Sequence, residues 1–290
     1  MALEQRPDGI RDTDYSLVSE IPGIRVTREA ASMLYTRYTF ASSFCKGKDV
    51  LELGCGAGIG LGYMARQARR LVAGDYTESM LRSARHSNRL SVPLVQLDAQ
   101  RLPFKDSCFD VVLLFEAIYY LPRPKEFLRE CHRVLRDTGT VLLCSANKEW
   151  AGFSPSALSH SYFSAFELRQ LLAENQFDSE IYGAFQTFTR TRSAKLVNFI
   201  RAFAVKLDLI PKTMRGKEFI KQFFYGRLVT LGSDIQEDMG EYCVPQLIPS
   251  EERRASRYKV IYAVGRPKAM TPIGQPSLIG SIELAETKTQ

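Results

Sequence analysis

The sequence predicts an α/β fold with a doubly wound, mostly parallel sheet that carries helices on both faces. Three observations favour this class. Strand-like and helix-like segments alternate between residues 27 and 185. The segment FDVVLLFEA at 109–117 is predominantly apolar, as a strand buried on both faces requires. A glycine-rich turn, GCGAG at 54–58, directly follows a strand-like segment, where sheets of this class bind ligands.

Seven segments have the composition of strands. They lie at 49–54, 70–75, 92–98, 109–117, 139–146, 179–185 and 258–267. The first five belong to a regular alternation of strands and helices. This alternation predicts parallel βαβ units with right-handed crossovers.

Five segments have helical periodicity, at 27–44, 58–68, 78–88, 124–136 and 164–175. Thr77 is a candidate N-cap for the third of these helices. Pro124 stands at the first position of the fourth, where a helix tolerates proline. Ser164 and Glu167 are three residues apart and predict a capping box at the start of the fifth.

The length of 290 residues suits one domain with a large insertion. A polar lead-in that packs over a site is expected first, and the core and the insertion follow it. The last residues are rich in Pro, Ser, Thr and charge, which predicts disorder. The expected parts are the lead-in 1–26, the core 27–186, the insertion 187–257, the final strand 258–267 and the tail 268–290.

Composition excludes several classes of protein. No apolar run reaches the roughly 18 residues that a membrane-spanning helix needs, and the first residues lack the pattern of a secretion signal. We therefore expect a cytoplasmic protein, with peripheral membrane contact as the alternative. The six cysteines form no CxxC pair and predict reduced, mostly buried thiols. The three histidines have no metal-ligand spacing, so no metal site is expected.

The glycines of the turn suit a ligand whose atoms approach the backbone closely, because glycine has no Cβ to hold them away. The pattern is G-x-G-x-G at 54–58. The dinucleotide fingerprint G-x-G-x-x-G fails, since its sixth position is Ile59, and no GK[ST] of a phosphate-binding loop is present. A nicotinamide enzyme and a P-loop enzyme are therefore both disfavoured.

Two acids end neighbouring strands. Asp75 lies 21 residues after Gly54, where a carboxylate accepts from both hydroxyls of a ribose. Asp98 ends the next strand, where it accepts from an adenine amino group. Either acid alone is equally well explained as a solvated strand end. The turn and the two acids together favour an adenosine-containing ligand.

The segments VLELGCGAG, LVAGDYTESML, VQLDAQRLPFKDSCFDVVLLFEAIYYL and FLRECHRVLRDTGTVLLCS resemble the class I S-adenosylmethionine-dependent methyltransferases of the small-molecule type. This type includes the enzymes of ubiquinone and menaquinone biosynthesis and those of sugars and natural products. The resemblance implies a Rossmann-like sheet of seven strands, the last antiparallel, with a helical, substrate-capping insertion before it. It also implies S-adenosylmethionine as cofactor and no metal.

The resemblance further implies the residues of the cofactor site. They are Glu52, Gly54, Gly56 and Gly58 around the methionine part, Asp75 on the ribose, Tyr76 beside the adenine, Asp98 and Ala99 on the adenine, and Glu116 at the methionine end or the substrate.

Tyr119 and His160 are the candidate catalytic residues. Methyl transfer depends mainly on positioning, but an alcohol acceptor needs a base. Tyr119 stands where quinone-type relatives often carry histidine, and a phenol with a pKa of about 10 is a poor base. It is expected to shape the pocket or to donate a hydrogen bond. His160 lies in the loop before the capped helix and is either the base or an ordinary loop histidine.

The net charge of +7 is concentrated in one segment, because residues 190–227 hold ten Lys or Arg and only two acids. Three alternatives remain for this part of the insertion. It is a helical cap with solvated charges, or a basic surface that meets an anionic membrane or a lipid-linked substrate. Nucleic acid is the least favoured partner, and the N-methyltransferase signature [DNS]-P-P-[YFW] is missing after the fourth strand.

The sequence therefore favours a methyltransferase that acts on an oxygen or nitrogen atom of a small biosynthetic intermediate, such as a sugar. The first alternative is a membrane-associated enzyme for a lipid or quinone. The second is a module that binds S-adenosylmethionine without turning it over, since no strong base is evident.

Overall fold

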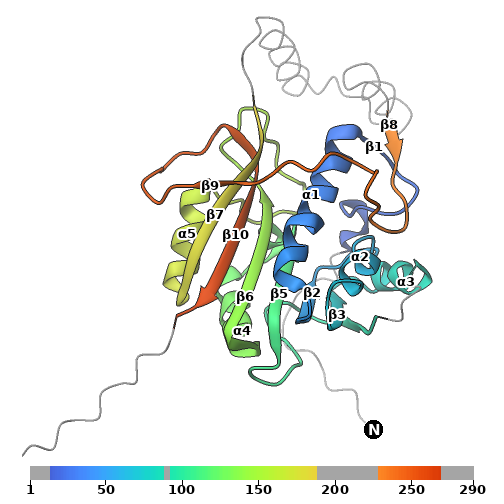
Figure 1. Cartoon of the computed structure of the whole chain (residues 1–290), viewed down its shortest axis with the longest axis horizontal. Helices are drawn as coiled ribbons and strands as arrows, with labels where there is room; N and C mark the ends of the chain where they lie inside the picture. The colour runs from blue at the N-terminus through green and yellow to red at the C-terminus, as the bar shows by residue number, and fades with distance from the viewer. Residues whose placement is uncertain (1–13, 88–91, 188–227, 269–290) are drawn as a thin grey trace, which may run out of the picture.

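The computed structural model describes residues 14–87, 92–187 and 228–268. Its centre is an eight-stranded sheet of order β4-β3-β2-β5-β6-β10-β7-β9 (Figure 1). The neighbours from β4 to β6 are parallel, and β10 lies antiparallel between β6 and β7. The strands are β2 Asp49–Leu53, β3 Arg70–Asp75, β4 Leu94–Gln96, β5 Phe109–Phe115, β6 Leu135–Ala146, β7 Phe177–Gln186, β9 Gln246–Ile248 and β10 Tyr258–Pro267. The predicted fold class is confirmed, including the antiparallel last strand.

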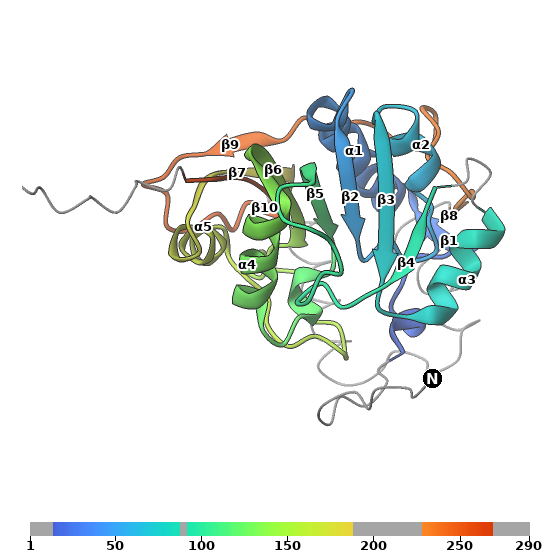
Figure 2. The same cartoon turned by 90° about the horizontal axis from the view of Figure 1, so that it is seen from below.

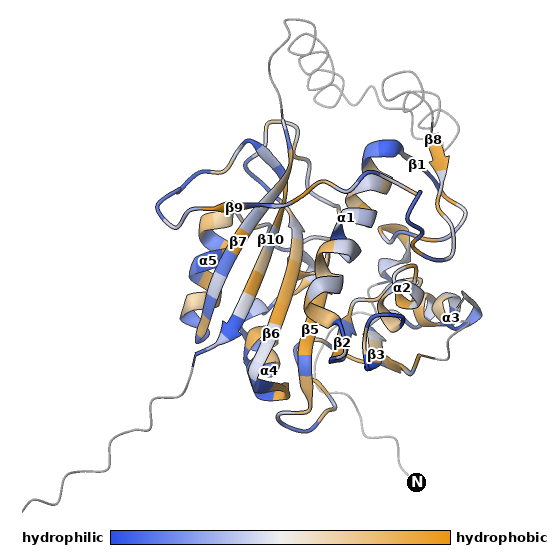
Figure 3. Cartoon of the chain, viewed as in Figure 1, coloured by the Kyte–Doolittle hydropathy of each residue, from blue (hydrophilic) through white to orange (hydrophobic). Residues whose placement is uncertain are grey.

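Helices cover both faces of this sheet (Figure 2). One face packs on α1 Arg28–Cys45, α2 Leu61–Ala65 and α3 Glu78–Ser87, and the other on α4 Pro124–Val134 and α5 Ala165–Glu174. Strand β5 is apolar because both of its faces are buried. Val111 and Leu113 pack in the core on the side of α1, α2 and α3, and Val112 and Leu114 pack in the core on the side of α4 and α5. The hydrophobic colour accordingly concentrates on the central strands (Figure 3).

Most helix starts follow the predicted local chemistry. The Thr27 hydroxyl caps α1 by accepting from the backbone N–H of Ala30, and Pro124 begins α4. Both bonds of the capping box between Ser164 and Glu167 are present at α5. Thr77 stands at the predicted N-cap position before α3, and its carbonyl accepts from the backbone N–H of Leu81. The expected side-chain capping bond is missing, because the buried Thr77 hydroxyl has no hydrogen-bond partner among the described residues.

The boundaries of α2 and β6 differ most from the prediction. Helix α2 covers only Leu61–Ala65 instead of 58–68, because residues before it form the glycine turn. Strand β6 begins at Leu135, so α4 ends two residues earlier than the periodicity indicates. Helix α4 is therefore followed directly by β6, a strand that was expected only from residue 139.

The sheet has one strand more than the seven that were predicted. The eighth, β9, pairs antiparallel with β7 at the edge, and a separate two-stranded sheet joins β1 Arg25–Thr27 to β8 Leu228–Thr230. Both β8 and β9 lie in the predicted helical insertion. Its described part, 228–257, contains no helix, because Gly232, Gly240, Pro245 and Pro249 interrupt any helical run.

Several predictions concern residues that lie outside the described ranges. They are the helical and basic character of 190–227, the first half of the lead-in and the tail after Lys268. The second half of the lead-in is described: it holds a short 3-10 helix, η1 Tyr15–Leu17, followed by β1. Across the described ranges, no helix is both long and apolar enough to cross a bilayer.

Candidate active site

A cavity of about 630 Å³ lies at the ends of the central strands. This volume falls within the range of about 300–1,000 Å³ that is typical of ligand pockets. The carboxyl ends of β2, β3, β5 and β6 and the residues after β4 border it, together with α1, the start of β10 and the lead-in. Its position is the one that an open α/β sheet offers to ligands.

The glycine turn after β2 depends on backbone angles that only glycine adopts readily. The φ angles are +66° at Gly54, +54° at Gly56 and +79° at Gly58. A Cβ on Gly56 would meet nothing within 4 Å, so this glycine leaves open space at the cavity wall. A Cβ on Gly58 would lie 2.9 Å from the Cβ of Ala84 in α3. Gly58 is therefore needed for packing, and it does not line the cavity.

Asp75 holds this turn in place from the end of β3. Its Oδ2 accepts from the backbone N–H of Gly56 at 2.8 Å, and its Oδ1 accepts from that of Thr77 at 2.8 Å. Burial raises the pKa of the Asp75 carboxyl, and these N–H bonds oppose the rise. Since each carboxylate oxygen has two lone pairs, both retain capacity for a further hydroxyl.

Asp98 and Ala99 line the same side of the cavity, as the sequence led us to expect. The Oδ1 of Asp98 accepts from the backbone and the side-chain N–H of Gln100, which fixes the carboxylate. Tyr76 also lines this side, with its ring centroid 6.3 Å from that of Tyr15. The ends of β2, β3 and β4 thus bring together the predicted turn and both predicted acids. We call this the donor side, because the resemblance implies that the methyl donor binds there.

Glu52 does not line the cavity, although the resemblance implies contact with the cofactor. It is 2% exposed and accepts from the Tyr38 hydroxyl at 2.7 Å. Its other oxygen is buried without a hydrogen-bond partner among the described residues. Burial raises the pKa of the Glu52 carboxyl to about 7, against the Tyr38 hydrogen bond and the charge of Arg37. Tyr38 occupies the cavity wall in its place.

Glu116 follows β5 with a left-handed backbone, φ +49°. Such a conformation is unfavourable for a residue other than glycine, and where it persists it often marks a functional site. The Oε2 of Glu116 accepts from the Tyr119 hydroxyl at 2.9 Å and from the backbone N–H of Ala146 at 3.3 Å. The carboxylate therefore lies in the cavity with a fixed orientation.

The Tyr119 hydroxyl acts as a hydrogen-bond donor to Glu116. Burial, and after it the charge of Glu116, raises the pKa of its phenol well above the usual value. Its ring stacks on Tyr162 with centroids 4.1 Å apart. The structure thus agrees with a pocket-shaping residue and gives no support to a base at this position.

His160 lines the cavity but is exposed. Its backbone N–H donates to the carbonyl of Tyr119 at 2.7 Å, which ties the loop to the segment after β5. Its role as a base remains a prediction.

Arg37 and Glu20 belong to the cavity wall and were missed from the sequence. Arg37 is 7% exposed, and its Nη1 donates to Glu20 at 3.2 Å. Burial alone would lower the pKa of the guanidinium, but Glu20, Cys144 and Glu116 outweigh it and raise the pKa. A signal was present, because Arg37 stands on the apolar face of its helix, three residues after Leu34.

The lead-in forms a cover over the cavity. Tyr15, Val18, Ser19 and Glu20 all line it, and the Tyr15 ring lies 5.1 Å from that of Tyr120. Backbone bonds between residues 23–24 and Leu231 anchor the lead-in to the residue after β8, within the predicted insertion.

The side formed by the ends of β5, β6 and β10 is predominantly apolar. We call it the acceptor side; besides Glu116 and Tyr119 its wall consists of Ala30, Met33, Leu34, Ala146, Trp150, Lys259 and Val260. Lys259 pairs with Glu29 and lies 5.4 Å above the Trp150 ring, so its charge is already compensated. Within the described ranges, no group of three or more His, Cys, Asp or Glu is arranged to hold a metal ion.

A family model described as a methyltransferase domain matches residues 51–143. This part of the chain is a methyltransferase domain. The match covers the glycine turn, both strand-end acids, Glu116 and Tyr119, and it confirms the family predicted from the sequence.

Curated relatives share this region. A probable S-adenosylmethionine-dependent methyltransferase of Mycobacterium tuberculosis is 36% identical over 130 residues, which cover 45% of this chain and 46% of the relative. A fatty-acid O-methyltransferase of Mycolicibacterium smegmatis is 41% identical over 118 residues, 39% of this chain and 42% of the relative. A probable phthiotriol/phenolphthiotriol dimycocerosates methyltransferase of Mycobacterium ulcerans is 35% identical over 148 residues, 47% and 57%. The chain spans about half the length of these relatives.

Solved structures share the fold of the methyltransferase domain. A possible histamine N-methyltransferase of Thermotoga maritima has a TM-score of 0.53 at 14% identity and covers 83% of this chain and 94% of its own. The 4+2 cyclase SpnF has a TM-score of 0.52 at 18% identity and covers 88% and 94%. At such identities the likeness concerns the fold alone. A cyclase with this fold also shows that the reaction must be argued from the site.

The residues of the donor side fit S-adenosylmethionine, the cofactor of this family. The turn leaves space at Gly56, where a Cβ would otherwise stand. Asp75 and Asp98 offer acceptors for the ribose and the adenine. Arg37 lines the cavity, and its buried Nε–H has no partner among the described residues.

Proposed function

We propose that this chain is an S-adenosylmethionine-dependent methyltransferase that methylates an oxygen atom of an apolar, lipid-like acceptor. The observation that carries the proposal is a single cavity in which the glycine turn and two strand-end acids open directly onto an apolar wall. The named substrates of two relatives, a fatty acid and phthiotriol compounds, support this class of acceptor.

S-adenosylmethionine, when bound, supplies a methyl group on a sulfonium that a nucleophile displaces in line. On the donor side, Asp75 would bind the ribose and Asp98 and Ala99 the adenine. The backbone of the turn at Gly54 and Gly56 would carry the methionine part. Glu52 and Gly58 would support this arrangement from behind without contact.

The residues of the acceptor side would orient the nucleophile and exclude water. Tyr119 holds Glu116 in a fixed direction, and the lead-in covers the cavity. A carboxylic acid is already ionised at neutral pH, so positioning suffices for it. An alcohol would need a proton acceptor, and His160 is the candidate that lines the cavity.

The apolar wall favours the lipid-like acceptor over the sugar that the sequence first suggested. A sugar needs several hydrogen-bonding side chains, because a polar group buried without a partner is costly. The acceptor side offers mainly aliphatic and aromatic surface, and the charge of Lys259 is paired. An alkyl chain would bury apolar area there, at about 25 cal/mol per Å².

Two measurements on the full chain test the proposal. Isothermal titration should detect binding of S-adenosylhomocysteine, and a transfer assay with labelled S-adenosylmethionine should compare dodecanoic acid, 1-dodecanol and octyl glucoside. We expect product with at least one of the first two and less with the glucoside. Asp75→Ala serves as the control that lacks the ribose ligand.

The remaining outcomes have distinct meanings. Methylation of the glucoside alone would refute the apolar acceptor and favour the sugar. Binding of S-adenosylmethionine without product on any acceptor would support the non-catalytic module. Co-sedimentation with anionic vesicles, compared at low and high salt, tests whether membrane contact assists delivery of the acceptor.

A further inference from the structure

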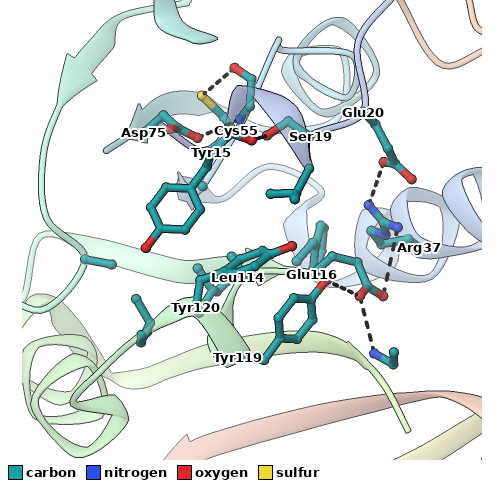
Figure 4. A pocket seen from close by; sticks show the side chains of 18 of the residues that line it. Tyr15, Ser19, Glu20, Arg37, Cys55, Asp75, Leu114, Glu116, Tyr119 and Tyr120 are labelled. Carbon is teal, nitrogen blue, oxygen red and sulfur yellow. Dashed lines mark hydrogen bonds and ion pairs between the residues drawn. The ribbon is translucent and has the colours of Figure 1, made fainter. Parts of the chain in front are cut away.

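A buried arginine lies between two carboxylates that come from different parts of the chain. Arg37 is on α1, Glu20 on the lead-in and Glu116 after β5, and all three line the cavity (Figure 4). The guanidinium nitrogens lie 3.2 Å from Glu20 and 4.0 Å from Glu116. Three segments therefore contribute to one charged cluster in an otherwise apolar wall.

The arginine has hydrogen-bonding capacity that the protein does not use. Its side chain is 8% exposed, and its Nε–H is buried without a partner among the described residues. Buried N–H groups almost always have a partner, and a charged donor is costly to leave unpaired. The guanidinium lies at the cavity wall with one donor unfilled, which fits a ligand that supplies an acceptor once the side chain turns toward it.

The charges of the cluster suit a zwitterion. One guanidinium binds a carboxylate in a planar, charge-assisted geometry, and two carboxylates accept from an ammonium group. The cluster has one positive and two negative charges, so it also favours a ligand with net positive charge. An α-amino acid attached to a sulfonium has this pattern.

The cluster also lies at the correct end of the cavity. The residue after Glu116 approaches the glycine turn, since a Cβ on Gly54 would lie 3.1 Å from the Cβ of Ala117. The acids at Asp75 and Asp98 border the opposite, adenosine-binding side. A donor held by those two acids would direct its amino-acid end toward Arg37.

We propose that Arg37, Glu20 and Glu116 form the subsite for the α-amino-acid end of the methyl donor, an inference that rests on the proposed function. Arg37 binds the carboxylate, and the two glutamates bind the ammonium group. Because Glu20 belongs to the lead-in, the same contact holds this cover over the cavity when the donor is bound.

Two nucleoside probes test the subsite without any acceptor. S-adenosylhomocysteine carries the amino-acid end, and 5′-methylthioadenosine lacks it but retains the adenosine and the thioether. By titration calorimetry on the full chain, wild type should bind S-adenosylhomocysteine at least about tenfold more tightly. Arg37→Lys and Glu20→Gln should each weaken the binding of S-adenosylhomocysteine by about tenfold. They should change the affinity for 5′-methylthioadenosine by less than about twofold.

Glu29→Gln is the matched control. It removes an ion pair on the same helix with similar exposure, 45% for the Glu29 side chain and 41% for Glu20, and Glu29 does not line the cavity. It should leave the binding of both probes unchanged. If Arg37→Lys does not fold, Glu20→Gln still tests the subsite, because Glu20 is on the partly exposed lead-in.

Hydrogen exchange provides a second measurement. S-adenosylhomocysteine, and not 5′-methylthioadenosine, should slow amide exchange in residues 18–24 of the wild type. Equal effects of the two probes, or equal losses of both in the variants, would overturn the subsite and leave the proposed function intact. Absence of binding of either probe would instead overturn the proposed function.

Discussion

The donor side and the acceptor side of the cavity are constructed differently. The donor side is built from the backbone turn of 54–58 and from the acids Asp75 and Asp98 beside it, all within 45 consecutive residues. The acceptor side is built from side chains that come from the lead-in, α1, the segment after β5 and β10. Backbone turns need particular residue types, so they are visible in a sequence. A wall of side chains needs only shape and polarity, so it varies with the acceptor.

The contrast predicts different consequences for mutations on the two sides. Changes on the donor side should disturb the fold or the affinity for the nucleoside. Changes on the acceptor side, apart from the cluster of Arg37, Glu20 and Glu116, should leave the nucleoside bound and alter the choice of acceptor or the rate of transfer to it.

The largest effect is expected at Gly58. Alanine there would be strained by the left-handed backbone, about 1–2 kcal/mol, and overpacked against Ala84, about 1–3 kcal/mol. The free energy of unfolding, measured with urea, should fall by about 2–5 kcal/mol. Gly56→Ala is the matched variant, since its Cβ would meet open space; it should lose only about 1–2 kcal/mol but weaken nucleoside binding. A larger loss at Gly56 than at Gly58 would contradict this division.

Glu52 supports the cavity wall through its hydrogen bond to Tyr38, and the pH dependence of stability tests the buried carboxyl. The folded carboxyl holds its proton up to a pKa of about 7, whereas the unfolded one releases it near the usual 4.5. Its contribution to stability is therefore present below pH 4.5 and is lost as the pH rises to 7. Relative to Glu52→Gln, the wild type should lose up to about 3 kcal/mol across this window.

Urea unfolding of both proteins at pH 5, 6, 7 and 8 measures this difference. Titrating groups that the two proteins share cancel in the comparison. Parallel stability curves would show that Glu52 is ionised in the folded protein throughout, and the buried, protonated carboxyl would have to be abandoned.

Asp75→Ala should weaken S-adenosylhomocysteine by about 1–3 kcal/mol, because charge-assisted hydrogen bonds to the ribose are lost. The variant also loses the bonds to the N–H groups of Gly56 and Thr77, so circular dichroism must confirm that the fold persists. Asp75→Asn retains one acceptor oxygen, so its affinity for S-adenosylhomocysteine should lie between those of wild type and Asp75→Ala. An affinity equal to that of wild type would remove Asp75 from the donor side.

The smallest effect is expected at His160 when the acceptor is a carboxylic acid. The imidazole is exposed and an ionised acceptor needs no base, so His160→Gln should change kcat by less than about threefold. With an alcohol acceptor the same variant should lose about 100-fold if His160 is the base. Comparison of dodecanoic acid with 1-dodecanol separates these cases, and a large loss with the acid would show that the acceptor side depends on His160 for positioning.

Much of the fold was predictable because its signals are local. The apolar run of β5, the proline of α4 and the capping box of α5 each determine a structure within a few residues. The errors lie where tertiary contacts overrule local preference. Thr77 precedes α3 as an N-cap does, yet its buried hydroxyl makes no capping bond among the described residues. Strand β9 forms because an edge of the finished sheet is available to it.

The sequence by itself determined the α/β class, the glycine turn and the two strand-end acids, because each depends on the chemistry of neighbouring residues. Only the tertiary structure decided that Glu52 supports the wall from behind, that Tyr119 donates to Glu116, and that Arg37 meets Glu20. The contacts of Glu52 with Tyr38 and of Arg37 with Glu20 join different elements, whose meeting depends on how α1 packs against the sheet and the lead-in. Periodicity shows that a residue such as Arg37 lies on the buried face of its helix, but it does not show what that face meets.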